Sequence, residues 1–485
     1  MNVLAFDFGA SSGRAILGSL KDGTITLEEV HRFDNDPVQA NGVFQWDVLR
    51  LFHEIKQGLL KAQKAGGFES IGIDTWGVDY GAFTKNQRLL ENPYHYRDLR
   101  TVDTPDAVRK IISDQELYEI SGNQIMNINT LFQLYVYKEQ SPELYNLTDS
   151  ILLIPDLFNY FLCGEKAAEV SIASTTQLLE PYGKDWNWPL IERLGLKKEM
   201  FPPVVKPGTV IGLLKDELCR ELGLDAKKIV AVPEHDTASA VAAVPTQDKD
   251  FVFISCGTWS LFGTELDTPC ISEKSAAYNI TNEVGYGDTS RFLKNIIGLW
   301  MIQETRRQFK REGKDYSYAL MEQLAREAKP FQCFIDPDDP VFTPPGNQPE
   351  RIKEFCRRTG QYVPQTDGEV IRCIYESLAM KYKYTFELLK ECTGKSFKTI
   401  HMVGGGTKDG FLCQMTADAT QTPVKAGPIE GTAAGNVAVQ LIAAGEIKDI
   451  WEARRLIGES FPIKEYEPGD DSWDKEYDRF VSVIQ

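Results

Sequence analysis

The sequence predicts a mainly α/β protein of two domains, and three observations support this prediction. Its 485 residues exceed what one ordinary hydrophobic core holds, so the length favours at least two domains. Segments with strand-like alternation and segments with helical spacing succeed one another along the chain, which is typical of α/β folds. One strand–turn–strand plan occurs near residue 3 and again near residue 251. We therefore place one domain at residues 1–245 and a second at 246–485.

The two turns of this repeated plan are rich in glycine and hydroxyl groups. The first copy reads "VLAFDFGASSGRAILGSL" from Val3, and the second reads "FVFISCGTWSLFGTEL" from Phe251. Backbone N–H groups in such turns can hold phosphate, and two facing turns could grip a nucleotide from both sides. Each turn taken alone is more simply explained as a tight β-hairpin whose glycines permit positive φ. The sequence contains no GxxxxGK[ST] phosphate loop.

Elements after the first hairpin are predicted from spacing. Helical periodicity covers residues 47–66 and 104–122, and each of these segments ends at glycine. Between them, "SIGIDTWGVDYGAF" (70–83) alternates as a strand, and it presents Trp76 beside Asp74 and Asp79. An aromatic face with carboxylates can hold a sugar, while a core tryptophan beside a turn is the simpler alternative.

"VPEHDTASAV" joins a strand to a small-residue helical pattern and contains Glu234, His235 and Asp236. A zinc site is disfavoured, because the other histidines and the cysteines show no ligand spacing. Asp236 at the start of a helix is predicted to cap it by accepting backbone N–H groups. The same position suits a catalytic base that orients a substrate hydroxyl, and the two roles are compatible.

The second half continues the alternation of helices and strands. A long amphipathic helix is predicted from Asp367 until Gly394, followed by the strand "TIHMV", the triple glycine Gly404–Gly406 and the helical "GFLCQMTADAT". Glycines without Cβ atoms can lie against a nucleoside, although a plain turn explains them equally. The segment after residue 446 is predicted to hold a peripheral helix.

Composition limits the partners. The net charge of −17 disfavours nucleic acid and anionic membranes, and no stretch has the length and apolarity of a membrane span. The N-terminal residues do not resemble a signal peptide, and the nine cysteines form no CxxC motif. We therefore expect a cytoplasmic protein, monomeric or a small homo-oligomer, that acts on a small molecule.

Taken together, the motifs closely resemble the rhamnulokinases, a branch of the FGGY carbohydrate kinases. The resemblance runs in order from about residue 3 to residue 445, and it rests on "FDFGASSGR", "GIDTWGVDY", "YRDLRT", "NINTLFQL", "VPEHDTASAV", "SCGTWSL", "LKNIIGLWMIQ" and "MVGGGTKDGFLCQMTAD". It implies the two-domain actin/Hsp70-like ATPase fold, which is ribonuclease H-like, with a sugar-binding N-terminal domain, a nucleotide-binding C-terminal domain and a cleft between them. It also implies ATP-dependent phosphorylation of L-rhamnulose at O1, giving L-rhamnulose 1-phosphate and ADP, in L-rhamnose catabolism.

The resemblance also implies site residues. The positions that match ATP contacts are Ala10, Ser11, Ser12, Gly13, Arg14, Thr258, Gln303 and Gly405. The positions that match sugar contacts are Gly77, His235, Asp236, Thr237 and Asn295. Asp236 matches the proton acceptor, and Asp7 matches the position that supports Mg²⁺. These parts suit phosphoryl transfer, which depends mainly on alignment and charge neutralisation.

Two residues depart from the family pattern, and two other functions stay open. Cys256 replaces a usual serine, which suggests sensitivity to thiol reagents, and Asp409 replaces a usual asparagine, which puts the details of nucleotide contact in doubt. One alternative function is an FGGY kinase for another ketose, such as L-fuculose or L-xylulose. The other is a sensor that binds ATP and sugar without turnover.

Overall fold

The structure is a computed structural model that describes residues 1–469 and 471–485. These residues form two compact units. The first comprises Met1–Gln247, Glu265–Phe292 and Gly431–Phe461, and the second comprises Asp248–Thr264, Leu293–Glu430 and Pro462–Gln485. The chain thus leaves the first unit soon after Pro245 and returns to it twice. The domain limits expected from the sequence stay a prediction.

The first unit mixes strands and helices. Its strands are β1 (Asn2–Phe8), β2 (Ser12–Lys21), β3 (Thr24–Asp34), β4 (Val38–Ala40), β5 (Val43–Gln45), β6 (Ser70–Thr75), β7 (Tyr80–Thr84), β8 (Thr148–Leu153), β9 (Ala168–Glu169), β10 (Val204–Val205), β11 (Val210–Leu213), β12 (Lys228–Val230) and β15 (Thr281–Val284). Its helices are α1 (Val48–Ala65), α2 (Thr104–Arg109), α3 (Asp114–Ser121), α4 (Thr130–Gln140), α5 (Pro142–Leu147), α6 (Ile154–Cys163), α7 (Val170–Ala173), α8 (Trp188–Arg193), α9 (Asp216–Leu222), α10 (Asp236–Ala242), α11 (Glu273–Ala277), α17 (Gly431–Ala443) and α18 (Ile450–Ser460).

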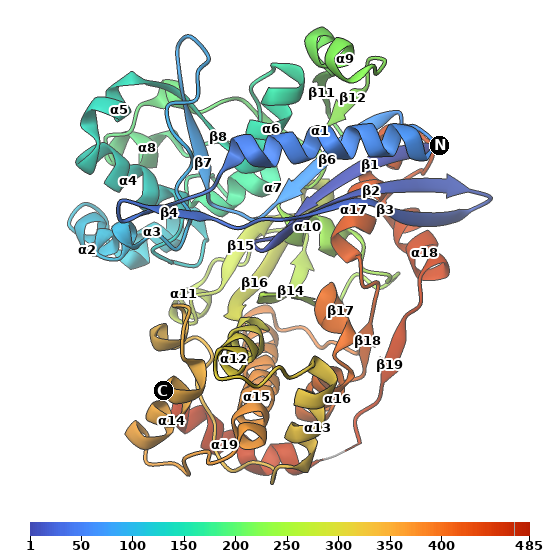
Figure 1. The fold of residues 1–485 in the computed structure, drawn as a ribbon. Coiled ribbons are helices and arrows are strands. Elements are labelled where there is room, and N and C mark those ends of the chain that lie inside the picture. Colours follow the sequence, from blue (N-terminus) through green and yellow to red (C-terminus); the bar gives the residue numbers. More distant parts are fainter. Residues whose placement is uncertain (470) are drawn as a thin grey trace. The chain divides into compact units, whose positions relative to one another are not determined.

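A six-stranded sheet in the order β11-β12-β6-β1-β2-β3 is the centre of the first unit (Figure 1). β1 runs antiparallel to β2, which confirms the predicted hairpin, and parallel to β6. Successive side chains of a strand face opposite sides, so Leu4 and Phe6 pack with α1 and α6, whereas Val3 and Ala5 pack with α17 and α18. The sheet is therefore covered by helices on both faces.

The second unit holds the greater part of a seven-stranded sheet and a group of helices. Its strands are β13 (Val252–Cys256), most of β14 (Trp259–Leu266), most of β16 (Ser290–Ile297), β17 (Ile400–Val403), β18 (Val424–Ala426) and β19 (Lys464–Tyr466). Its helices are α12 (Trp300–Arg311), α13 (Tyr318–Glu327), α14 (Gln348–Arg358), α15 (Asp367–Thr393), α16 (Gly410–Thr420) and α19 (Ser472–Ile484). Five of these strands are neighbours in the sheet, in the order β14-β13-β17-β18-β19.

Local predictions for the second unit are confirmed. β13 and β14 form the second antiparallel hairpin, and β13 is parallel to β17. α15 begins after Thr366 in a capping box with Glu369 and ends at Gly394, which adopts a φ of 67°. This left-handed conformation favours glycine and explains why the helix stops there.

One strand prediction is wrong in its extent. Residues 70–83 were expected to form one strand, but β6 ends at Thr75 and β7 begins only at Tyr80. Between them Val78 has a φ of 68°, so the chain turns where simple alternation predicts extension. No helix among the described residues has the length and apolarity needed to cross a membrane.

Candidate functional site

Three carboxyl groups of the first unit gather where β1 and β6 end and α10 begins. Asp7 on β1 pairs in register with Asp74 on the parallel strand β6, and Thr75 bridges to His235, which precedes α10. Asp236, the first residue of α10, is close enough to Asp74 to affect its ionisation. The carboxyl ends of parallel strands commonly form ligand sites in α/β proteins.

Asp74 is the most deeply buried member of this group. Asn436 donates a 2.6 Å hydrogen bond from Nδ2 to Oδ2, while Oδ1 is buried and has no hydrogen-bond partner among the described residues. Burial, together with the charges of Asp7 and Asp236, raises the pKa of Asp74 well above its ordinary value. A divalent cation would relieve this repulsion, and carboxylate oxygens are the ligands that Mg²⁺ prefers. The donor set therefore fits Mg²⁺, with Arg14 ion-paired to Asp7 at its edge.

The capping prediction for Asp236 is wrong. His235 occupies the N-cap position, and Asp236 lies inside the first turn of α10, where its Oδ1 accepts a 3.0 Å hydrogen bond from the Thr237 hydroxyl. Its side chain is 32% exposed, against 9% for His235, so Asp236 is the member of this motif that a substrate can reach.

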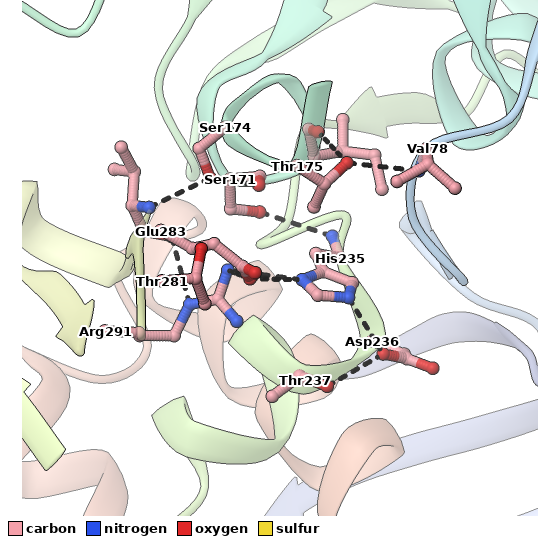
Figure 2. A network of polar contacts seen from close by, with 12 residues as sticks. Val78, Ser171, Ser174, Thr175, His235, Asp236, Thr237, Thr281, Glu283 and Arg291 are labelled. Carbon is pink, nitrogen blue, oxygen red and sulfur yellow. Dashed lines mark hydrogen bonds and ion pairs between the residues drawn. The ribbon is translucent and has the colours of Figure 1, made fainter. Parts of the chain in front are cut away.

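His235 belongs to a buried ionic network, which Figure 2 shows from close by. Its Nδ1 lies 3.2 Å from Oε2 of Glu283, and Arg291 Nη2 lies 3.1 Å from the same oxygen. Burial opposes ionisation of Glu283, but Arg291, His235 and Thr281 outweigh it and lower the pKa of this carboxyl group. Nδ1 also lies 3.2 Å from Arg291 Nη2, and Nε2 lies 3.5 Å from Oδ1 of Asp236, so the ring stands between the Glu283–Arg291 pair and Asp236.

Glu234, whose role the sequence left open, belongs to a second buried group with Asp156 and Glu169. The Glu234 backbone N–H donates to Glu169 Oε2 at 3.0 Å, and the Asn159 amide donates to Glu234 Oε1 at 2.7 Å. Burial raises the pKa of all three carboxyl groups, and the hydrogen bond between Asp156 and Glu234 requires a proton on one of them. Glu234 thus anchors the segment that precedes Asp236.

The sugar-holding face expected at Trp76 is not available. Trp76 is buried, with its ring centroid 4.1 Å from that of Trp46, and both indole N–H groups donate to Oδ2 of Asp79. These residues form core structure. Gly77, by contrast, is half-exposed, and a Cβ atom there would lie about 3 Å from the Thr175 side chain, so packing leaves little room for a larger residue.

The first hairpin turn presents polar groups at its tip. The Gly9 N–H donates to the Ser12 carbonyl at 2.9 Å, and the Asn35 N–H donates to the Ser11 carbonyl at 3.2 Å. Ser11 is exposed, and Ala10, Ser12 and Arg14 are half-exposed. Gly13, however, is buried in β2, where a Cβ atom would lie 2.3 Å from the Phe33 ring. Of the five predicted phosphate-loop residues, Gly13 is therefore the one set by packing.

In the second unit, the second hairpin adjoins the start of α12. The Thr258 carbonyl accepts 3.1 Å hydrogen bonds from the N–H groups of Gly298 and Trp300, which ties the turn to the helix that carries Gln303. Asn295 lies on β16, which leads into this helix, and is half-exposed. The second hairpin, β16 and α12 are thus connected to one another, and they carry Thr258, Asn295 and Gln303.

The triple glycine packs on the second hairpin. A Cβ atom at Gly406 would clash with the Cys256 Sγ at 2.2 Å, and one at Gly404 would lie 3.2 Å from the Cys256 carbonyl oxygen, whereas a Cβ at Gly405 would meet no atom within 4 Å. Burial raises the pKa of the Cys256 thiol to about 11, and the residue is 1% exposed. The expected sensitivity to thiol reagents at Cys256 therefore loses its basis, because a buried neutral thiol reacts slowly.

Asp409, the other departure, is a capping residue. Its Oδ1 accepts a hydrogen bond from the Leu412 N–H at 3.0 Å at the start of α16, and its Oδ2 accepts one from the Tyr375 hydroxyl at 2.6 Å. Both carboxylate oxygens of Asp409 thus accept hydrogen bonds from the protein. Capping of α16 accounts for an aspartate at this position without any contact to a nucleotide.

Three charged residues near the predicted site were missed by sequence reasoning. Glu283 and Arg291 hold His235, and Lys294 precedes Asn295 on β16. Burial lowers the pKa of the Lys294 amino group to about 8, although nearby carboxylates oppose the shift. The available signal was the presence of Arg291 and Lys294 within the apolar strand "SRFLKNII", because charged groups inside a buried strand need partners.

Comparisons with known proteins place this geometry among sugar kinases. Residues 2–243 match the N-terminal domain, and residues 252–444 the C-terminal domain, of the FGGY family of carbohydrate kinases. The rhamnulokinase of Bacteroides thetaiotaomicron is 42% identical over 486 residues, covering 100% of this chain and 99% of that protein. The rhamnulokinase of Bacillus subtilis is 42% identical over 96% of this chain and 95% of that protein.

Solved structures agree on the fold. A ligand-bound xylulose kinase from Lactobacillus acidophilus superposes with a TM-score of 0.83 at 18% identity, covering 99% of this chain and 97% of that one. Plasmodium falciparum glycerol kinase with ADP gives a TM-score of 0.78 at 13% identity, covering 100% and 96%. At these identities the likeness concerns the fold alone.

Proposed function

Because the chain belongs to the FGGY family of carbohydrate kinases, we propose that it phosphorylates L-rhamnulose at O1 with ATP, giving L-rhamnulose 1-phosphate and ADP. The observation that carries the choice of substrate is the 42% identity to rhamnulokinases over essentially the whole of both chains. We place the reaction in the cytoplasm and in L-rhamnose catabolism. The partners are the sugar and ATP, and the protein acts as a monomer or small homo-oligomer.

Asp236 is assigned as the base that accepts the proton of the sugar O1 hydroxyl. Its position in the first turn of α10 keeps the carboxyl group oriented, and its partial exposure lets the hydroxyl approach. His235 and Thr237 lie beside it to hold other sugar hydroxyls, and Gly77 and Asn295 are assigned to the same substrate. Glu283 and Arg291 set the orientation of the imidazole.

The first hairpin and the second-unit residues are assigned to ATP. Ala10, Ser11, Ser12 and Arg14 offer donors to phosphate from the first turn, while Thr258, Gln303 and Gly405 serve the nucleotide from the second unit. Asp7 and Asp74 would hold Mg²⁺, which supplies neutralisation of the charge that develops on the phosphoryl oxygens. Gly13, where the Phe33 ring leaves no room for a Cβ atom, is assigned to the same phosphate turn.

An ADP-release assay over a panel of ketoses tests this proposal, with Asp236→Asn as the key variant. L-rhamnulose should be the best substrate, and Asp236→Asn should lower kcat by about 10² to 10⁴ while sugar binding, followed by calorimetry, persists. Thr237→Ser, which keeps the hydroxyl, serves as the matched control. A preference for L-fuculose or L-xylulose would point to a sibling kinase, and absence of turnover with binding intact would point to a sensor.

A further inference from the structure

Three buried cysteines, none of them assigned to the reaction, converge in the second unit. The Sγ atoms of Cys333, Cys356 and Cys373 all lie within 4.8 Å of one another, and the residues are 3%, 0% and 2% exposed. They come from three separate stretches: the segment after α13, helix α14 and helix α15. A core cysteine ordinarily packs as a small apolar residue among hydrocarbon, so three sulfur atoms meeting at one point form a potential ligand set.

The segment that carries Cys333 is fastened to α15 on both sides. The Phe331 N–H donates to Glu376 Oε2 at 2.9 Å, and the Ile335 N–H donates to the Ser377 hydroxyl at 2.9 Å. Glu376 and Ser377 lie one turn beyond Cys373 on the same helix. Cys333 and Cys373 are therefore held in a fixed relation by backbone hydrogen bonds.

Gln361 fastens the same segment to the end of α14. Its backbone N–H donates to the Cys356 carbonyl at 2.9 Å. Its side chain both accepts from the Phe334 N–H and donates to the Phe334 carbonyl, each at 2.8 Å. All three sulfur atoms are thus positioned by the scaffold before any ligand arrives, which lowers the cost of binding one.

The spacing of the three sulfur atoms also suits a cation. Thiolate is the form of cysteine that binds metal, so binding displaces the thiol protons. With metal–sulfur bonds of about 2.3 Å, three ligands around one ion lie about 4 Å apart, within the observed separation.

We propose that Cys333, Cys356 and Cys373 form a site for a soft, thiophilic cation bound by three sulfur atoms. Among the described residues no histidine, aspartate or glutamate completes the group, and structural zinc sites ordinarily use four ligands. Cations that accept an all-thiolate environment, such as Cu⁺ and Cd²⁺, fit better than Mg²⁺ or Ca²⁺. The bound cation would link α14 and α15 to the segment between α13 and α14, with release of the thiol protons.

Cd²⁺ titration of the reduced full-length protein tests the site, in the presence of a chelator that suppresses weak binding to surface thiols. We expect one tight equivalent, read by ultraviolet sulfur-to-cadmium charge-transfer absorption, and an increase in Tm. Cys333→Ala, Cys356→Ala and Cys373→Ala should each lose the tight equivalent. Cys413→Ala removes a buried cysteine of α16 outside the group and should retain it.

X-ray absorption of the cadmium-loaded wild type keeps the test decisive if a variant fails to fold. Three sulfur neighbours around the ion support the site. Oxygen-dominated coordination, equal binding by wild type and all three variants, or a disulfide between any two of these cysteines in the protein as purified would overturn the proposal. None of these readouts depends on the sugar-kinase assignment, so the two can fail separately.

Discussion

At the scale of single residues, the buried charged groups around α10 determine how the side chains at the start of this helix are oriented. Asp236 is partly exposed, but His235 beside it is buried and lies against Glu283, which is also ion-paired with Arg291. The orientation of the imidazole is therefore fixed by residues about fifty positions further along the chain.

Glu283→Gln tests this positioning role. The amide has the same shape but no charge, so Arg291 loses its ion-pair partner and the His235 imidazole loses the carboxylate that holds its orientation. We expect kcat/KM for the sugar to fall about 10- to 100-fold, mostly through KM, with a changed pH profile and little change in the KM for ATP. Ser174→Ala, which removes a hydroxyl that accepts from the Val284 N–H in the same network, is the control. Equal losses for both substrates would indicate a merely structural role.

The carboxyl pair of Asp156 and Glu234 predicts a pH dependence of stability. Both pKa values are raised in the folded state, so the fold retains protons that the unfolded chain releases. This contribution is fully present below the unfolded pKa of about 4 and is lost as pH rises through the higher folded pKa values.

Glu234→Gln removes one of these two titrations. As pH rises above the unfolded pKa of about 4, the variant's free energy of unfolding should improve steadily relative to the wild type, as measured by urea denaturation at each pH. Glu217→Gln, at an exposed position on α9, should run parallel to the wild type. Parallel curves for Glu234→Gln as well would contradict the shared-proton interpretation.

At the scale of elements, the site depends on the close approach of α10 and α17. A Cβ atom at Gly435 of α17 would lie 1.8 Å from the Ser239 carbonyl oxygen of α10. Only glycine allows this approach, because the obstacle is backbone and cannot rotate away. The same helix, α17, carries Asn436, whose amide holds Asp74.

Gly435→Ala should therefore destabilise the protein by about 3 kcal/mol or more, or prevent folding, as measured by urea unfolding and soluble yield. Gly458→Ala on α18 is the matched control, because this position is exposed and its nearest neighbour, Pro245 Cβ, lies 3.3 Å away. It should change stability by less than about 1 kcal/mol. Similar effects of both changes would mean that the helix contact is looser than described.

At the scale of the whole molecule, the first unit is assembled from three stretches of chain. Val3 and Ala5 of β1 are covered by apolar residues of α17 and α18, which come from residues 431–461. A fragment of residues 1–247 would expose this face of its sheet to water.

We expect the fragment 1–247 to lack a cooperative thermal transition in circular dichroism and to bind an apolar dye. Joining residues 265–292 and 431–461 to it through flexible Gly/Ser linkers should restore cooperative unfolding. Cooperative melting of the fragment alone, near the Tm of the full chain, would show that these segments are dispensable.

Much of the local structure could be predicted from the sequence, because it depends on interactions between residues that are close in the chain. Both hairpins, the helix ended by Gly394 and the strand-to-helix position of Asp236 depend on neighbouring residues, side-chain periodicity and glycine conformation. The motifs that match the sugar kinases are likewise continuous stretches, so the family could be identified before the structure was known.

Tertiary structure alone decided which distant groups meet. Nothing in the sequence near Asp74 pairs it with Asn436, joins Glu283 to His235, or brings Cys333 to Cys356 and Cys373. The sequence left Trp76 open between a core residue and a sugar-holding face, and the contact with Trp46, 30 residues earlier, decided for the core. Burial and pKa depend on contacts between residues far apart in the chain, and these contacts are set only when sheets and helices pack. The sequence by itself therefore determined the local elements and the family, while the fold determined the chemical state of the site.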